Sequence, residues 1–206
     1  MLTLFPMSLV LLPGARIPLT VSQQQYDDLF AGYVTNRVIT VLTEQEDGED
    51  MLADVGCLAH IEQVERLGDD EITFTLVGQV RCHLDDIVEK RGRLLVKSYH
   101  LLEDEVDLKL EDPVMSETQS LTNVYLDLLA DVDPEMLKGT KFTHVKPRDS
   151  YKLADYLVLS EVERQEMLQT SSVRKRFSMA AAFLKREIAT LKFLMTDPQN
   201  SVYITN

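Results

Sequence analysis

The sequence predicts an α+β protein in which a β-rich first half with one inserted helix is followed by a group of helices. Apolar and polar residues alternate over 54–66 and 71–84, the period of half-buried strands. A continuous apolar stripe at helical spacing runs from about Val173 to Met195. Strands therefore precede helices along the chain, and this order excludes an alternating βαβ parallel sheet.

The first half divides into short strands around one helix. Ser22 suits the N-cap of a helix over Ser22–Asn36, because the apolar residues that follow recur at helical spacing. Gly78 interrupts the longest strand and predicts a bulge or a sharp bend there. The acidic segment Glu44–Asp54 lacks the ligand spacing of a calcium loop, so we expect a solvated connecting loop. The predicted strands are Arg16–Val21, Arg37–Leu42, 54–66, 71–84 and Arg93–Tyr99.

The second half is predicted to be helical. A charged connector over Glu103–Asp112 marks the junction between two predicted domains, 1–105 and 106–206. Ser160, with Glu163 three residues later, is a capping box that opens a short helix. The other predicted elements are a helix around Leu121–Leu129, a loop over Asp131–Arg148, a helix over Asp149–Val158 and the last helix over about Val173–Met195.

Composition restricts the class of protein. The chain has 206 residues, 45% of them hydrophobic, and a formal net charge of −13, which matches a globular protein with a core of its own. A phosphate backbone requires clustered Lys and Arg, so the acidic balance argues against nucleic acid as the main partner. Two cysteines, Cys57 and Cys82, are too few for a disulfide framework and favour a reducing cytoplasm, with a single bridge as the alternative.

The amino terminus is apolar, but its pattern is not that of a signal peptide. No Lys or Arg precedes Arg16, and Pro6 and Pro13 interrupt the apolar run. Elsewhere no apolar run approaches the ~20 residues that a membrane helix needs. We therefore expect a protein of the cytoplasm with no membrane partner.

The sequence contains no motif for catalysis or cofactor binding. The spacing of its glycines excludes a Gly-x-Gly-x-x-Gly loop, and no Gly-Lys-Ser/Thr sequence exists for a Walker A loop. Cys57 and His60 lie an odd number of positions apart, as do Cys82 and His83, so the members of each pair point to opposite faces of a strand. These side chains cannot converge on one ion without a bulge. We expect no metal site, no cofactor and no catalytic residue.

Three segments carry a family resemblance. Leu4–Leu19 has prolines and a glycine at fixed places, Val55–Val64 contains Gly-x-x-Ala-x-Ile, and Ile72–Leu84 is a strand broken by a glycine. Together they resemble the substrate-binding domain of ATP-dependent Lon protease over about residues 1–103. The resemblance implies a PUA-like pseudo-barrel followed by helices. In Lon proteases the ATPase and peptidase domains lie downstream, and neither fits in this chain, so the resemblance implies a binding module that is not an enzyme.

The leading hypothesis is a bacterial module that binds unfolded or degron-bearing polypeptides, with a protease or a chaperone as a further partner. A sheet beside a helix offers strand edges to which an unfolded segment can add. The alternatives are an RNA-binding PUA-like protein that uses the basic last helix, and a small hydrolase assembled from distant histidines. The apolar stripe of the last helix covers its neighbours or forms a homodimer. The predicted polypeptide-binding residues are Gln23, Gln24, Gln25 and Asp28.

This predicted site lies where the chain departs from the family that it resembles. Many family members begin the first helix with Glu-Pro-Arg-Tyr, whereas this chain has Gln23-Gln-Gln-Tyr26. The tyrosine is retained and the charges are absent. What the helix start recognises in other members therefore does not transfer directly to this chain.

Overall fold

The computed structural model describes residues 1–30, 36–46, 49–68, 70–109, 112–132 and 145–196. Close contacts group the chain into two compact units. The barrel unit comprises Met1–Glu103 with Ser160–Ser171, and the helical unit comprises Asp104–Leu159 with Ser172–Asn206. The predicted domain limits, 1–105 and 106–206, stay a prediction, and the contacts add Ser160–Ser171 to the first half.

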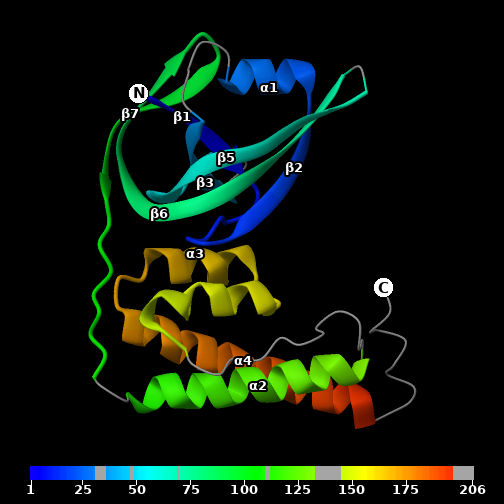
Figure 1. The fold of residues 1–206 in the computed structure, drawn as a ribbon. Helices are drawn as coiled ribbons and strands as arrows, with labels where there is room; N and C mark the ends of the chain where they lie inside the picture. The colour runs from blue at the N-terminus through cyan, green and yellow to red at the C-terminus, as the bar shows by residue number, and fades with distance from the viewer. Residues whose placement is uncertain (31–35, 47–48, 69, 110–111, 133–144, 197–206) are drawn as a thin grey trace. The chain divides into compact units, whose positions relative to one another are not determined.

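Five strands of the barrel unit close on one another (Figure 1). They are β1 (Leu2–Met7), β3 (Arg37–Glu46), β5 (Val55–Leu67), β6 (Glu71–Lys90) and β7 (Arg93–Leu101). Their order is β1, β7, β6, β5 and β3, and β3 pairs with β1 again. The β1–β3 pair is parallel and the other four pairs are antiparallel. This confirms the predicted α+β fold with a β-rich pseudo-barrel.

The interior of the barrel is apolar. Burial alternates along much of β6, as the sequence predicts, whereas residues 55–59 of β5 are all buried and do not alternate. At Gly78 a Cβ atom would lie 2.2 Å from the carbonyl oxygen of Leu12, so only glycine fits this approach of two backbones. The register of β5 and β6 shifts beside it, between Leu58 and Ala59, which confirms the predicted bulge. The interior cluster consists of Leu4, Ile39, Val41, Leu58, Cys82, Leu84 and Val96.

Two further elements lie against the first part of β6. Strand β2 (Arg16–Ser22) pairs with β6, and helix α1 (Gln23–Phe30) follows it directly. Tyr26 and Phe30 contact Phe74 of β6, each with its ring centroid 5.7 Å from that of Phe74. These aromatic contacts attach α1 to the sheet. The predicted helix extends to Asn36, and its residues 31–35 lie outside the described residues.

Helix α3 (Glu161–Gln169) belongs to the barrel unit although it lies in the second half of the chain. Ser160 and Glu163 form the predicted capping box at its start. Polar contacts bind the helix to the barrel at its start, middle and end. Val10 N–H donates to Glu161 Oε2 (2.6 Å), Gln165 Nε2 donates to the carbonyl of Val55 (2.9 Å), and Arg81 Nη1 donates to the carbonyls of Leu168 (3.1 Å) and Gln169 (3.3 Å).

In the helical unit, α2 (Pro113–Val132) packs against α4 (Val173–Thr196), as Figure 1 shows. The apolar stripe of α4 is buried in this packing over most of its length. The stripe therefore covers neighbouring segments, which is the first of its two predicted uses. Its buried residues are Val173, Phe177, Ala180, Ala181, Leu184 and Ile188.

The predicted helix over Asp149–Val158 is wrong, because two short 3-10 helices replace it. Ala154 N–H donates to the carbonyl of Tyr151 (3.0 Å), and Leu157 N–H donates to the carbonyl of Ala154 (3.3 Å). Each bond spans three residues, as in a 3-10 helix and not as in an α-helix. The two 3-10 helices are Pro147–Ser150 and Lys152–Tyr156.

The predicted solvated loop over Glu44–Asp54 is also wrong. Strand β3 continues to Glu46 and pairs with β4 (Glu49–Leu52) in a hairpin, with Thr43 opposite Leu52. Backbone pairing with a neighbouring strand holds this segment as a strand despite its acidic composition. The amino-acid composition of a segment does not show whether its backbone pairs with another strand.

Candidate functional site

Three of the four predicted site residues lie at the start of α1 in distinct roles. Gln25 N–H donates to Ser22 Oγ at 3.1 Å, and Ser22 N–H donates to Gln25 Oε1 at 3.0 Å. This reciprocal pair confirms Ser22 as the N-cap and commits Gln25 to the helix start. Gln23 Nε2 donates to Asp27 Oδ2 at 2.9 Å. Gln24 is exposed.

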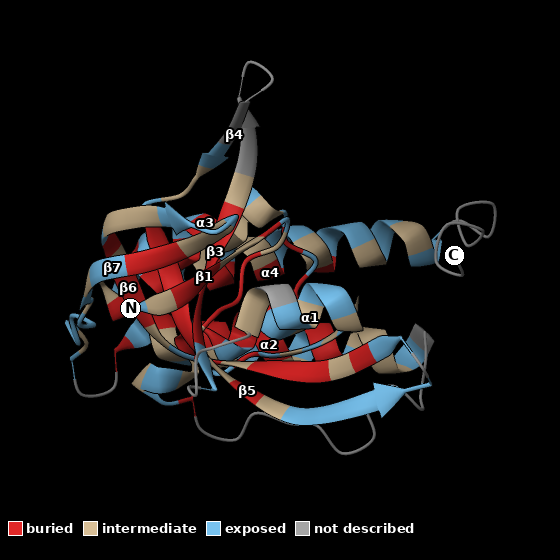
Figure 2. Ribbon diagram, turned by 90° about the horizontal axis from the view of Figure 1, so that it is seen from above, coloured by how far each residue is buried: buried red, intermediate tan, exposed pale blue. Residues whose placement is uncertain are grey.

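The end of the β5–β6 hairpin lies beside this helix start. Leu67 pairs with Glu71, and Glu71 pairs with Ser22 on its other side. Val64 and Leu67 are 48% and 49% exposed, and Figure 2 shows the end of β5 in pale blue. Sequence reasoning missed both residues, although apolar residues directly before the turn at Gly68 are a usable signal. We call Gln23, Gln24, Gln25, Val64 and Leu67 the hairpin-end surface.

The outer edge of β2 adjoins the hairpin-end surface. Among the described strands β2 has β6 as its one neighbour. Because hydrogen bonding alternates along an antiparallel pair, Arg16, Pro18 and Thr20 direct their backbone groups to the outer edge. Pro18 has no N–H, so the edge offers donors at Arg16 and Thr20 only over these three positions. Two hydrogen bonds fix this alternation: Gly78 N–H to Ala15 C=O (3.0 Å) and Gln23 N–H to Asp70 C=O (2.8 Å).

Charge around the hairpin-end surface is mostly negative. Glu65, Asp70 and Glu71 are exposed there, and Arg66 is the neighbouring cation. Asp28, the fourth predicted site residue, lies in α1, but its side chain falls outside what the structure describes. An acidic surface of this kind repels a phosphate backbone and suits neutral or basic polypeptides.

The basic helix α4 was the candidate RNA surface. Four cations of this helix have carboxylate partners within the described residues. One of these, Arg176, is fully buried. The cations therefore serve ion pairs of the protein, and the observed contacts do not favour the RNA alternative. The pairs are Arg174–Asp112 (3.3 Å), Arg176–Asp104 (2.8 Å), Lys185–Glu117 (2.6 Å) and Arg186–Glu187 (3.1 Å).

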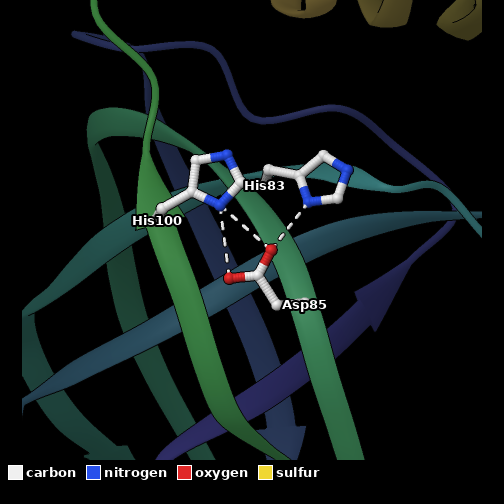
Figure 3. A group of neighbouring side chains, drawn as sticks. All are labelled: His83, Asp85 and His100. Atoms are coloured by element: carbon white, nitrogen blue, oxygen red, sulfur yellow. Dashed lines mark hydrogen bonds and ion pairs between the residues drawn. The ribbon is translucent and has the colours of Figure 1, made fainter.

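A second polar group lies on β6 and β7, where the sequence predicts no site. His83 and His100 are direct cross-strand partners, and their rings stack with centroids 5.0 Å apart. The β6–β7 register shifts at Asp85, whose carboxylate faces the Nδ1 edges of both rings (Figure 3). Asp85 Oδ1 lies 3.2 Å from His83 Nδ1 and 3.0 Å from His100 Nδ1, and Oδ2 lies 3.2 Å from His100 Nδ1.

The carboxyl group of Asp85 and the thiols of the two cysteines differ in their charge at neutral pH. Hydrogen bonds from His100 and His83 hold the pKa of Asp85 below its ordinary value, so the group is a carboxylate at neutral pH. Burial raises the pKa of both Cys57 and Cys82 to about 12, so each remains a thiol. Both cysteines are free, which excludes the single-bridge alternative in this structure.

The hydrolase alternative required a histidine beside a serine or a cysteine. The hydrogen bonds of His83 and His100 go to Asp85. Cys82 is buried in the barrel interior, on the face of β6 opposite to His83. In the described part of the chain, these two imidazoles therefore have no nucleophile as a hydrogen-bond partner.

Comparison with known proteins identifies the family. Residues 1–186 match the sequence model of the ATP-dependent protease La (LON) substrate-binding domain. The chain belongs to this family. The match confirms the resemblance of the first half and extends it through α2 and α3 into α4.

Full-length relatives of this Lon substrate-binding family are much longer than the chain. It is 25% identical over 197 residues to the Lon protease of Rhizobium meliloti (strain 1021), covering 89% of the chain and 24% of that protein. It is 22% identical over 147 residues to the Lon protease of Escherichia coli (strain K12), covering 71% of the chain and 19% of that protein. The chain thus spans about a quarter or less of the length of these relatives.

Solved structures share the fold. A Lon N-terminal domain protein from Xanthomonas campestris is 26% identical with a TM-score of 0.66, covering 88% of this chain and 97% of that one. The N-terminal domain of Mycobacterium avium complex Lon protease is 15% identical with a TM-score of 0.63, covering 89% and 97%, and supports the fold alone. None of the described helices combines the length and apolar character needed to cross a bilayer.

Proposed function

We propose that this chain binds exposed polypeptide segments at its hairpin-end surface, as a recognition module without ATPase or peptidase activity of its own. The observation that carries the proposal is the match of residues 1–186 to a substrate-binding domain family. Such a module selects unfolded or degron-bearing polypeptides. It acts in the bacterial cytoplasm and passes them to a protease or a chaperone.

The chemistry of the hairpin-end surface supports this proposal. Val64 and Leu67 expose apolar area that a hydrophobic segment can cover. Gln24 offers an amide that both donates and accepts hydrogen bonds, which suits the peptide groups of an extended chain. Asp28 follows Gln24 by four positions, so their Cα atoms lie on one side of α1. Neutral polar groups beside apolar ones favour binding that tolerates many sequences.

The outer edge of β2 supplies the second element of the proposed site. An extended segment that pairs with this edge receives backbone hydrogen bonds from Arg16 and Thr20. Pro18 interrupts the row of donors between them and prevents a continuous ladder. This arrangement favours short, reversible pairing over stable strand addition, which fits a module that releases what it binds.

The test is fluorescence anisotropy with a labelled, permanently unfolded polypeptide and the full chain. We expect saturable binding that the double variant Val64→Ser, Leu67→Ser weakens about five- to tenfold, about 1 kcal/mol, because apolar burial is lost. Leu101→Ser is the matched control, since Leu101 is 53% exposed at the end of β7. Absence of saturable binding contradicts the function, and an equal loss in the control contradicts the assigned surface.

A further inference from the structure

His83, Asp85 and His100 form a compact set of metal-ligand side chains on the outer face of the barrel. One ligand atom from each residue can be chosen so that all three lie within 4.8 Å of one another. Figure 3 shows both imidazoles turned toward the Asp85 carboxylate. We propose that these three residues bind one divalent transition-metal ion of the Zn²⁺ class.

The distances between the donor atoms are close to those that such an ion imposes. With metal–ligand bonds of about 2.1 Å, neighbouring ligand atoms lie about 3.4 Å apart in a tetrahedral site and about 3.0 Å apart in an octahedral one. The observed Nδ1–carboxylate distances are 3.0 and 3.2 Å. The chosen ligand atoms of the three residues lie at most 4.8 Å apart. Bringing the two most distant of these atoms to about 3.4 Å therefore requires them to approach by about 1.4 Å at most.

Side-chain exposure permits that adjustment. The side chains of His83, Asp85 and His100 are 40%, 38% and 57% exposed. Exposed imidazoles can rotate without disturbing the barrel core, and solvent reaches the remaining coordination positions. Three protein ligands with an open position are the pattern of zinc sites that bind water or a further donor.

The ligand types fit the ion. Imidazole nitrogens suit Zn²⁺, Ni²⁺ and Cu²⁺ better than Mg²⁺ or Ca²⁺, which favour oxygen ligands. A neutral imidazole presents its Nδ1 lone pair to a metal when its single proton resides on Nε2. Binding therefore exchanges the Nδ1–H hydrogen bonds to Asp85 for three bonds to the metal, and the protons move to Nε2 through solvent. No redox step is involved.

The register of β6 and β7 creates the site. His83 and His100 meet because they are directly paired, and the shift at Asp85 brings a carboxylate to both rings. The sequence prediction of no metal site depends on the alternation of side chains along a single strand. That alternation says nothing about His83 and His100, which lie on two different strands.

The test is isothermal titration of Zn²⁺ into the full chain without a histidine tag, followed by Co²⁺ substitution and visible spectroscopy. We expect one ion per chain and Co²⁺ absorption bands of a site with nitrogen ligands. His83→Gln, Asp85→Asn and His100→Gln should each weaken binding at least about tenfold, since loss of even an outer partner of a ligand costs 10–100-fold.

His60→Gln is the matched control. His60 lies on β5, and its Nε2 is 2.9 Å from Asn36 Nδ2, away from the proposed ligands. Circular dichroism and thermal unfolding verify that each variant is folded. Failure of the wild-type chain to bind one Zn²⁺, or equal weakening by His60→Gln, overturns the proposal. Loss of polypeptide binding with Zn²⁺ binding intact concerns the proposed function alone.

Discussion

The two units of the molecule each bury an arginine, and they hold it differently. In the barrel unit Arg81 is 2% exposed and donates to the backbone carbonyls of Leu168, Gln169 and Glu103. In the helical unit Arg176 is fully buried and makes two hydrogen bonds to the carboxylate of Asp104, at 3.1 and 2.8 Å. One guanidinium is bound by peptide dipoles and the other by an opposite charge.

The difference shows what each arginine does. Two of the carbonyls that Arg81 binds close α3, where the helix dipole is negative, so Arg81 attaches that helix to β6. Arg176 also donates from Nε to Ser150 Oγ at 3.1 Å and lies 4.2 Å from the Tyr151 ring centroid. It therefore joins α4 to the start of the helical unit and to the 3-10 segment. Each arginine connects parts of the chain that the sequence keeps apart.

The largest effect should come from Arg81→Met. Methionine retains much of the side-chain volume but removes the donors, which leaves three carbonyls without a charged partner. We expect a loss of about 3 kcal/mol or more in the free energy of unfolding, measured by urea denaturation. Amide exchange should rise first in α3. If α3 keeps its protection, the assigned role of Arg81 is wrong.

Arg176→Met should cost less, about 2 kcal/mol. Asp104 is 36% exposed, so water can solvate the carboxylate that loses its partner. The same denaturation experiment measures it, and the loss of protection should lie in α4. A loss larger than that of Arg81→Met would reverse the comparison between the two arginines.

High pH should weaken the barrel unit in particular, because both cysteines lie in it. Their pKa is about 12 in the fold and ordinary in the unfolded chain, so above about pH 9 the unfolded state releases protons that the fold retains. Stability then falls as pH rises, by roughly 1.5–2 kcal/mol per thiol at pH 10. The double variant Cys57→Ala, Cys82→Ala should show a flatter profile between pH 8 and 10. Parallel profiles for both proteins would contradict this account.

The smallest effect should come from Lys185→Met. Lys185 and Glu117 are 59% and 48% exposed, and surface pairs of this kind contribute about 0.5 kcal/mol or less. Thermal unfolding at low and high salt measures the difference. A change as large as that of Arg176→Met would mean that exposed ion pairs stabilise the helical unit as much as the buried one.

Sequence patterns within a single segment predicted the strands, helices and caps that depend on neighbouring residues. Alternation identified β5 and β6, helical spacing identified α4, and cap chemistry identified the starts of α1 and α3. The bulge beside Gly78 followed from a single glycine in a strand. These features depend on residues within a few positions of one another.

Long-range pairing accounts for what sequence reasoning missed. Strand β1, with Pro6 in an apolar run, gives no alternation, and it becomes a strand by closing the barrel between β3 and β7. The docking of α3 depends on Arg81, which precedes that helix by about 80 residues. His83 and His100 meet through strand register, and Leu67 reaches Ser22 through Glu71. Each of these contacts joins residues far apart in the sequence, so no pattern within a single segment predicts it.

We expect the barrel unit to bind polypeptide at its hairpin-end surface. Hydrogen–deuterium exchange of the full chain, with and without a saturating unfolded polypeptide, tests it most directly. Bound polypeptide should protect the end of β5, the length of β2 and the start of α1. Protection confined to α2 and α4, or no protection anywhere at saturation, would contradict it.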